Sequence, residues 1–372
     1  MAPADSSNQA KAAIPSPAGE LREAKRHGLI AQLLCATRPT KLDSITWAYL
    51  WFADLSNLEE LVRACEEIRL FTHCMHLGLS KSEDKTQVID TWAVARTKEE
   101  LGKASEDEES DTDSEEPPTK KRRLALDQEK RPSVSEEEAT HIANKLCTER
   151  DNASCVVTGC RDPVEIAHIL PIGLVMKEAQ EVQGFWSQLY RFWSEERVDA
   201  WIKQARALEG TGACSNLLCM TDMTHKLWKK ARFALKTLSL SEDWRSLEVQ
   251  FYWLPVCKYR SRVSATKVPS RFPRKLSGTD VYGQETMLFS IATDKKLCSG
   301  DILTFTTNDP NGHPLPSMEL LDMQWVLNRV LALSGATYAT DKELYDDYWP
   351  NECSYIDSED DLYYAQVKVS KG

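Results

Sequence analysis

The sequence SNLLCMTDMTHKLWKKARFAL at residues 215–235 decides the fold, together with EIAHILP at residues 165–171 and CVVTG at residues 155–159. The first stretch holds a short apolar element and then the start of a helix, for which Thr221 or Asp222 would serve as the N-cap. The second reads as a strand that Pro171 terminates, and the third reads as a strand followed by a turn. The two strands predict a hairpin beside the helix, and hence an α+β fold.

Further helices and strands are predicted around these stretches. Residues 174–208 form a predicted helical insertion, and the apolar pattern predicts strands over 246–254, 286–291 and 302–306, followed by a helix over 318–333. Five apolar side chains of the insertion fall on about one helical face: Trp186, Leu189, Tyr190, Trp193 and Trp201. A stripe at this spacing is more often hydrophobic core than a platform for stacking bases, and we interpret it as core.

The composition changes along the chain and divides it into six segments. Ala, Ser and Pro dominate the start, helical periodicity follows, and the acidic run SEDEESDTDSEE at residues 105–116 cannot pack a core. We expect a disordered tail (1–20), a small helical N-terminal region (21–97), a disordered acidic and basic linker (98–145), a folded central domain (146–275), a C-terminal extension of that domain with strands and a helix (276–340), and an acidic tail (341–372).

The 372-residue chain carries a formal net charge of -11, which by itself argues against a nucleic-acid partner. The distribution of the charge reverses that argument. Residues 226–275 contain 13 Lys and Arg against 3 Asp and Glu, a local net charge of +10. Such a field suits a phosphate backbone, and the favoured contacts are Lys229, Lys230 and Arg232, although a lysine-rich helix face is also commonly only solvated.

Three polar residues form the most informative set: His168 at the end of a predicted strand, Asn216 at the start of the apolar element, and His225 near the start of the helix. This order and the Asn-x8-His spacing resemble the HNH endonucleases of the ββα-metal kind. The stretches quoted above, FWSQLYRFWSEERVDAW (185–201) and LPSMELLDMQWVLNRVLALSGA (315–336) are similar to a fungal group of HNH-nuclease-domain proteins. The resemblance implies that the central domain has a ββα-metal HNH core.

The resemblance also implies an endonuclease that hydrolyses DNA phosphodiester bonds with Mg²⁺ or another divalent metal. A neutral imidazole can take a proton from the attacking water, and His168 is the predicted general base. A divalent ion with open positions neutralises charge on the phosphate and the departing oxygen, and His225 is the predicted first metal ligand. Asn216 can either coordinate the ion through its amide oxygen or orient His168, and the supporting role is favoured.

Two positions depart from the usual HNH pattern. Ala167 precedes His168 where many members carry an Asp or His ligand, and Lys229 stands at the common last ligand position. Neither a methyl group nor an ammonium group coordinates a metal. Glu165, Asp222 or the DNA phosphate can complete the site, although strand alternation points Glu165 away from His168 and Asp222 is more typical of a helix cap. The alternative is a catalytically degenerate HNH-fold protein that acts as a nucleic-acid- or protein-binding module.

Four of the 11 cysteines flank the same motif as two pairs, Cys155-x4-Cys160 and Cys214-x4-Cys219. Two cysteine pairs hold a structural zinc in some HNH domains, but the usual spacing has two intervening residues, and buried cysteines behave as small hydrophobes. A structural zinc is therefore not expected at these pairs, and reduced thiols are the default in an intracellular protein.

The tetrad Lys120-Lys121-Arg122-Arg123 follows two prolines and resembles a monopartite nuclear localisation signal. A short exposed cationic segment fits an acidic import receptor, whereas the alternative is a patch that balances the neighbouring acidic run. The signal is favoured, so we expect a nuclear protein that can also occupy the cytoplasm. The N-terminus lacks the regions of a secretory signal, and no apolar run approaches the ~20 residues that span a bilayer, so no membrane partner is expected.

Overall fold

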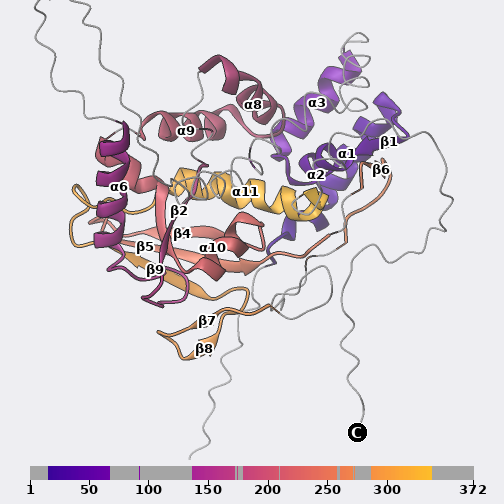
Figure 1. The fold of residues 1–372 in the computed structure, drawn as a ribbon. Coiled ribbons are helices and arrows are strands. Elements are labelled where there is room, and N and C mark those ends of the chain that lie inside the picture. Colours follow the sequence, from indigo (N-terminus) through magenta and orange to yellow (C-terminus); the bar gives the residue numbers. More distant parts are fainter. Residues whose placement is uncertain are drawn as a thin grey trace, which may run out of the picture.

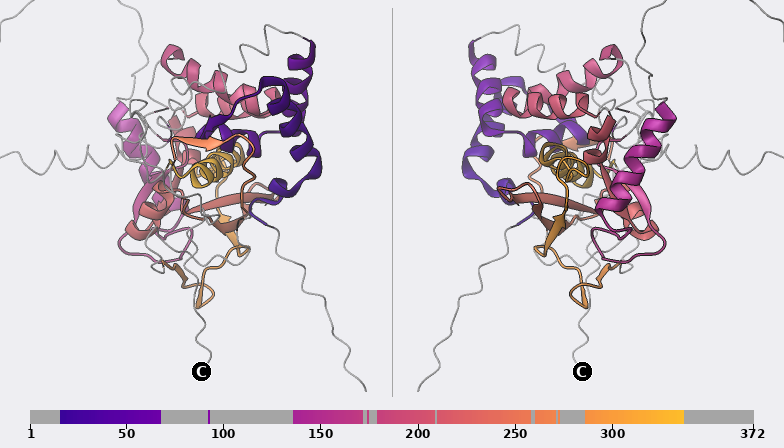
Figure 2. Two further views of the ribbon diagram at one scale, coloured as in Figure 1. Left: turned by 90° about the vertical axis from the view of Figure 1, so that its right-hand side faces the viewer. Right: turned by 90° about the vertical axis from the view of Figure 1, so that its left-hand side faces the viewer.

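Helix α11 (Met318–Ser334) lies at the centre of the computed structural model (Figure 1). Ser317 caps its N-terminus by accepting a hydrogen bond from the backbone N–H of Leu320, and Gly335, at φ 76°, ends it. Every residue from Met323 to Ser334 is buried, so the helix is covered on all sides. Figures 1 and 2 show a sheet along one side of α11 and helices along the other. The helix predicted over 318–333 is confirmed.

The structure describes residues 16–67, 92, 136–171, 174, 179–208, 210–257, 260–270, 272 and 286–336. Helices and small antiparallel sheets are mixed along these residues, which confirms the α+β class. The acidic run at 105–116, the basic tetrad at 120–123 and the acidic tail from 341 lie outside the described residues. No helix in the described part is long and apolar enough to cross a bilayer.

A three-stranded antiparallel sheet packs against α11. Its strands lie in the order β4 (Phe233–Leu240), β5 (Ser246–Trp253) and β9 (Ile302–Thr306). Tyr252 of β5 and Trp325 of α11 are in ring contact, with centroids 5.3 Å apart. The strands predicted over 246–254 and 302–306 are confirmed. In 286–291 only β7 (Phe289–Ser290) is a strand, and it pairs with β8 (Lys295–Lys296).

The strand pair beside helix α10, called the hairpin below, differs from the predicted one. Strand β2 (Glu165–His168) pairs antiparallel with β3 (Leu217–Met220), and helix α10 (Asp222–Lys229) follows β3 directly. The CVVTG stretch, predicted as the partner of β2, consists of turns. Its residue Val156 donates a backbone hydrogen bond to the carbonyl of Cys219, and Gly159, at φ 77°, bends the chain away. The prediction of a strand at 155–159 was therefore wrong.

The insertion between β2 and β3 contains α8 (Ala179–Phe192), α9 (Glu195–Arg206) and the 3₁₀ helix η2 (Gly210–Asn216). Trp193 and Trp201 are buried, which confirms that the aromatic stripe is core. Arg197 fixes α9 in place, because its guanidinium donates to Asp322 of α11 at 2.7 Å and to Asp54 at 2.9 Å.

The N-terminal region consists of η1 (Gly19–Arg22), α1 (Ala24–Thr37), β1 (Lys41–Asp43), α2 (Ser44–Phe52) and α3 (Leu55–Glu67). Helix α2 is buried along its whole length, and β1 pairs with β6 (Arg262–Ser264). These elements share one hydrophobic core with the β2–β3 hairpin, the sheet and α11. Of the helical region predicted over 21–97, the structure describes residues 21–67 and 92; residues 21–67 are mostly helical and pack onto the central domain.

Candidate functional site

A glutamate and a histidine meet between the hairpin and helix α10. Nδ1 of His225 lies 2.7 Å from Oε2 of Glu165. Thr221 is the N-cap of α10 and accepts a hydrogen bond from the backbone N–H of Thr224, so His225 lies in the first turn of this helix, toward β2. The His225 side chain is 6 % exposed, whereas the Glu165 side chain is 37 % exposed. A carboxylate that accepts from Nδ1–H fixes the imidazole so that coordination of a cation uses Nε2.

Asn216 supports the backbone that follows β2. Its Oδ1 accepts a hydrogen bond from the N–H of Leu170 at 2.7 Å, and its Nδ2 donates to the carbonyl of the same residue at 2.9 Å. The backbone carbonyl of Asn216 also accepts from the N–H of Ile169 at 2.8 Å. Asn216 is buried, and its amide is committed to the chain next to His168. Of the two roles predicted for Asn216, this geometry favours orientation of the chain at His168 and does not support metal coordination.

His168 is the last residue of β2, and its backbone is held from two directions. Its carbonyl accepts a hydrogen bond from the indole Nε1 of Trp228 in α10 at 3.1 Å, and Asn216 fixes the two residues after it. His168 is half-buried, unlike His225. Two backbone anchors of this kind define where its imidazole can lie while leaving the residue partly open to water.

His168 and Glu165 project from opposite faces of β2, because side chains alternate along a strand. Ala167, on the Glu165 face, belongs to the main core with α10, whereas Ile166, on the His168 face, packs in a small separate cluster beside α6 (Glu136–Arg150). At roughly 3.4 Å per residue, the Cα atoms of Glu165 and His168 are about 10 Å apart. A phosphodiester would have to lie across the edge of β2 to contact both His168 and the Glu165–His225 pair.

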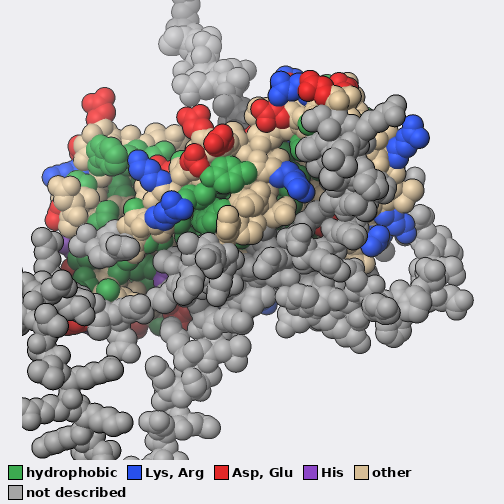
Figure 3. Space-filling model, turned by 90° about the horizontal axis from the view of Figure 1, so that it is seen from above, with side chains coloured by type: hydrophobic (Ala, Val, Ile, Leu, Met, Phe, Trp, Pro, Cys, Tyr) green, Lys and Arg blue, Asp and Glu red, His purple; other side chains and the backbone are tan. Residues whose placement is uncertain are grey.

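The three basic residues predicted to contact phosphate differ in exposure. Lys230 is exposed at the end of α10 and Lys229 is half-buried. Arg232 is 3 % exposed, so its guanidinium does not lie on the surface as a phosphate contact requires. Lys229 and Lys230 therefore remain candidate phosphate contacts, and the prediction of Arg232 as a phosphate contact was wrong. On the face seen in Figure 3, the acidic and basic side chains of the described residues are interspersed.

A family model matches the part of the chain that contains these residues. Residues 155–236 match the model of the HNH endonuclease family. This HNH segment begins in the turns before β2 and ends within β4, so it contains His168, Asn216 and His225. No curated protein and no solved structure matches the chain. The match supports an HNH nuclease domain in the HNH segment, and domains of this kind generally depend on divalent metal and act on nucleic acid.

Glu165 and Asp222, the two residues considered for completing the site, have different partners in the structure. Glu165 contacts His225, and it lies on the strand face opposite His168, as strand alternation predicts. Glu165 shares a face with Ala167, and that is the face on which α10 lies. Asp222 pairs instead with Lys226 at 3.1 Å on the exposed side of α10. Glu165 could have been identified from its position two residues before Ala167. Side chains at i and i+2 lie on one face of a strand, so Glu165 shares the face of the usual ligand position.

The two cysteine pairs considered for zinc do not form one cluster. Cys155 lies 3.8 Å from the hydroxyl of Thr224, whereas the Sγ of Cys214 lies 3.6 Å from Nη1 of Arg150. The zinc arrangement suggested by the two Cys-x4-Cys spacings therefore has no counterpart among the described residues. Cys219 instead faces Cys147, which precedes the HNH segment.

Proposed function

We propose that this protein is a metal-dependent HNH-type endonuclease that hydrolyses phosphodiester bonds of DNA. The observation that carries the proposal is the contact between Glu165 and His225 inside the HNH segment. With Glu165 bonded to Nδ1, the Nε2 atom of His225 would hold Mg²⁺ or a related ion, which needs only one or two protein ligands besides water and substrate phosphates. Glu165 thus orients the histidine ligand from outside and does not replace the ligand that Ala167 lacks.

The residues of the chain have distinct roles in this proposal. The imidazole of His168 accepts a proton from the attacking water. Asn216 and Trp228 are positioning residues, because they bind the backbone around His168. When bound, the divalent ion supplies positive charge that stabilises the phosphate in the transition state. Lys229 and Lys230 lie at the end of α10, where they can contact the DNA backbone.

A plasmid-nicking assay with and without divalent metal tests the proposal. Wild-type protein is expected to convert supercoiled DNA to the open circle only when Mg²⁺ or Mn²⁺ is present. Glu165→Gln keeps the shape of the side chain but removes its charge, and is expected to lower nicking about 10–100-fold at limiting metal. The matched control is Glu196→Gln, an exposed position on α9, which should nick like the wild type. Nicking that is independent of metal, or unchanged in Glu165→Gln, would contradict the assigned metal site.

A second candidate function is a degenerate HNH-fold module that binds nucleic acid or protein without cutting. Two observations favour it: Ala167 presents a methyl group at the usual ligand position, and His168 leaves β2 on the face opposite the Glu165–His225 pair. The nicking assay separates the two functions. DNA binding by wild-type protein without any cleavage, across several divalent metals, would select the binding module.

We also propose that the protein is imported into the nucleus through Lys120-Lys121-Arg122-Arg123, with support from the sequence alone. Changing the four residues to alanine is expected to move a fluorescently tagged protein from nuclei to the cytoplasm, because an import receptor binds such a segment through its charge. Changing four exposed charges elsewhere, at Lys25, Glu59, Glu195 and Glu196, provides the control. An unchanged distribution of the tetrad variant would refute this assignment.

A further inference from the structure

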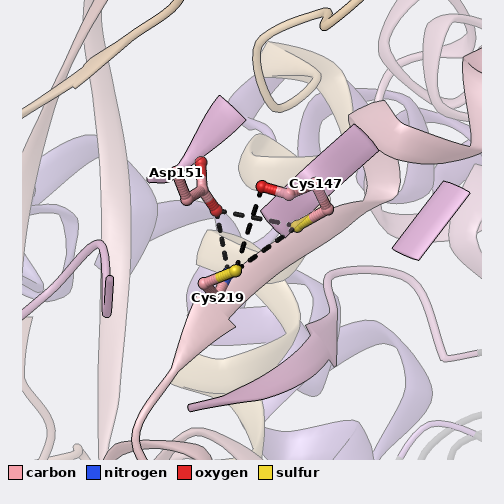
Figure 4. Close-up of side chains that lie close together, drawn as sticks. All are labelled: Cys147, Asp151 and Cys219. Carbon is pink, nitrogen blue, oxygen red and sulfur yellow. Dashed lines mark hydrogen bonds between the residues drawn. The ribbon is translucent and has the colours of Figure 1, made fainter. Parts of the chain in front are cut away.

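A small second core joins helix α6 to strand β3 and consists largely of cysteine. Its buried residues are Ala143, Cys147, Cys214, Leu217 and Cys219. Arg150 at the end of α6 and Asp151 in the turn after it close this core, and their side chains are 0 % and 4 % exposed. Figure 4 shows the Cys147, Asp151 and Cys219 side chains directed toward one another from α6, the turn after it and β3.

The distances among the three donors fit three of the four positions of a tetrahedral metal centre. Sγ of Cys147 lies 3.9 Å from Sγ of Cys219 and 3.6 Å from Oδ2 of Asp151, and all three ligand atoms lie within 4.8 Å of one another. Zinc bonds of about 2.3 Å to sulfur and about 2.0–2.2 Å to oxygen place neighbouring tetrahedral ligands about 3.8 Å (S–S) and about 3.5 Å (S–O) apart. The side chains are therefore spaced to receive the ion with little movement.

The charges of the surrounding groups also fit a bound dication. Two thiolates and one carboxylate around a zinc ion leave a net charge of −1, and the guanidinium of Arg150 balances it. Nη2 of Arg150 lies 3.5 Å from Sγ of Cys147 and 2.9 Å from Oδ2 of Asp151. The backbone N–H of Cys219 donates to the same carboxylate oxygen at 2.9 Å. Donors of this kind orient metal ligands from the outside, as buried metal centres require.

We propose that Cys147, Asp151 and Cys219 bind one zinc-type divalent ion, which fastens α6 to β3. On binding, each of the two thiols releases a proton and forms a metal–sulfur bond, while the carboxylate contributes an oxygen. The ion differs in position and in donor type from the one assigned to His225. Because β3 starts directly after Asn216 and leads into the cap of α10, the ion stabilises the strand between Asn216 and His225.

Cobalt(II) titration of the full-length reduced protein tests the inference. A cobalt ion bound by thiolates in tetrahedral geometry gives an intense sulfur-to-metal absorption in the near ultraviolet and ligand-field bands in the visible region. Wild-type protein is expected to develop both to saturation at one equivalent and to lose them when one equivalent of zinc is added. Cys147→Ser and Cys219→Ser should each remove most of the near-ultraviolet band. Cobalt at His225 has no sulfur ligand and cannot produce it.

Cys214→Ser and Cys155→Ser are the matched controls, because both cysteines are buried but lie outside the three-donor group. Both variants are expected to keep the spectrum. A second measurement needs no variant: zinc should slow alkylation of Cys147 and Cys219 in moderate urea, as read by peptide mass spectrometry, and leave the exposed Cys35 unaffected. Absence of the sulfur band in wild-type protein, its persistence in Cys147→Ser and Cys219→Ser, or a Cys147–Cys219 disulfide that reductant does not remove from the folded protein would overturn the inference.

Discussion

Replacement of His168 by alanine is expected to lower metal-dependent nicking about 10²–10⁴-fold, the range that a positioned general base contributes. The backbone of His168 is held by the indole of Trp228 and by Asn216, and neither contact uses the imidazole. The substitution should therefore remove the base while leaving the hairpin folded. Initial rates of plasmid nicking at saturating Mg²⁺ give the measurement, and circular dichroism verifies the fold.

Two further observations distinguish a base from a residue that only supports the fold. Free imidazole in the buffer should partly restore nicking by His168→Ala, because it can take the proton in place of the missing side chain. His141→Ala, at an exposed position on α6, is the control and should behave like the wild type. Nicking by His168→Ala at the wild-type rate would remove His168 from the mechanism.

Arg150→Met is expected to destabilise the protein by about 3–5 kcal/mol, the usual result of removing one partner of a buried ion pair. Nε of Arg150 lies 2.7 Å from Asp151, and its two terminal nitrogens donate to the carbonyls of Cys214, Leu217 and Pro314. Burial lowers the pKa of Arg150, but the hydrogen bond and charge of Asp151 outweigh it and raise the pKa above its usual value. Methionine fills similar space but leaves a buried carboxylate and three carbonyls without their donor.

Urea unfolding measures this loss, and Lys145→Met on the same helix is the control. Lys145 is exposed and only 3.9 Å from Glu149 in an i,i+4 pair, so its loss should cost about 0.3–0.5 kcal/mol. The comparison separates the burial of the ion pair from the general effect of losing a positive charge on α6. A loss below about 1 kcal/mol for Arg150→Met would mean that the buried network contributes little to stability.

The parts of the site that the sequence predicted depend on neighbouring residues. The end of β2 at His168 follows from Pro171, and the start of α10 follows from the cap at Thr221, which then sets His225 in the first turn. The helix at 318–333 follows from its periodicity in the same way. These features depend only on the φ and ψ preferences and the polarity of adjacent residues, so they can be predicted from the sequence.

The pairing of strands could not be read in this way. CVVTG was predicted to pair with β2, but β3 takes that position and is separated from β2 by the helical insertion. Alternation gave the face of Glu165 correctly but not the element that covers it, and burial excluded Arg232 from the surface. The choice among possible strand partners depends on which long-range packing buries most apolar surface, and this is a property of the whole chain.

The sequence by itself determined the order of His168, Asn216 and His225, the start of α10, the α+β class and the helix at 318–333. Only the tertiary structure decided that Glu165 meets His225, that Asn216 binds the backbone of Leu170, and that Cys147 meets Cys219 across 72 positions of the chain. The physical reason is the range of the forces involved. Local conformational preferences act between adjacent residues, whereas a shared site forms only when packing brings distant segments together.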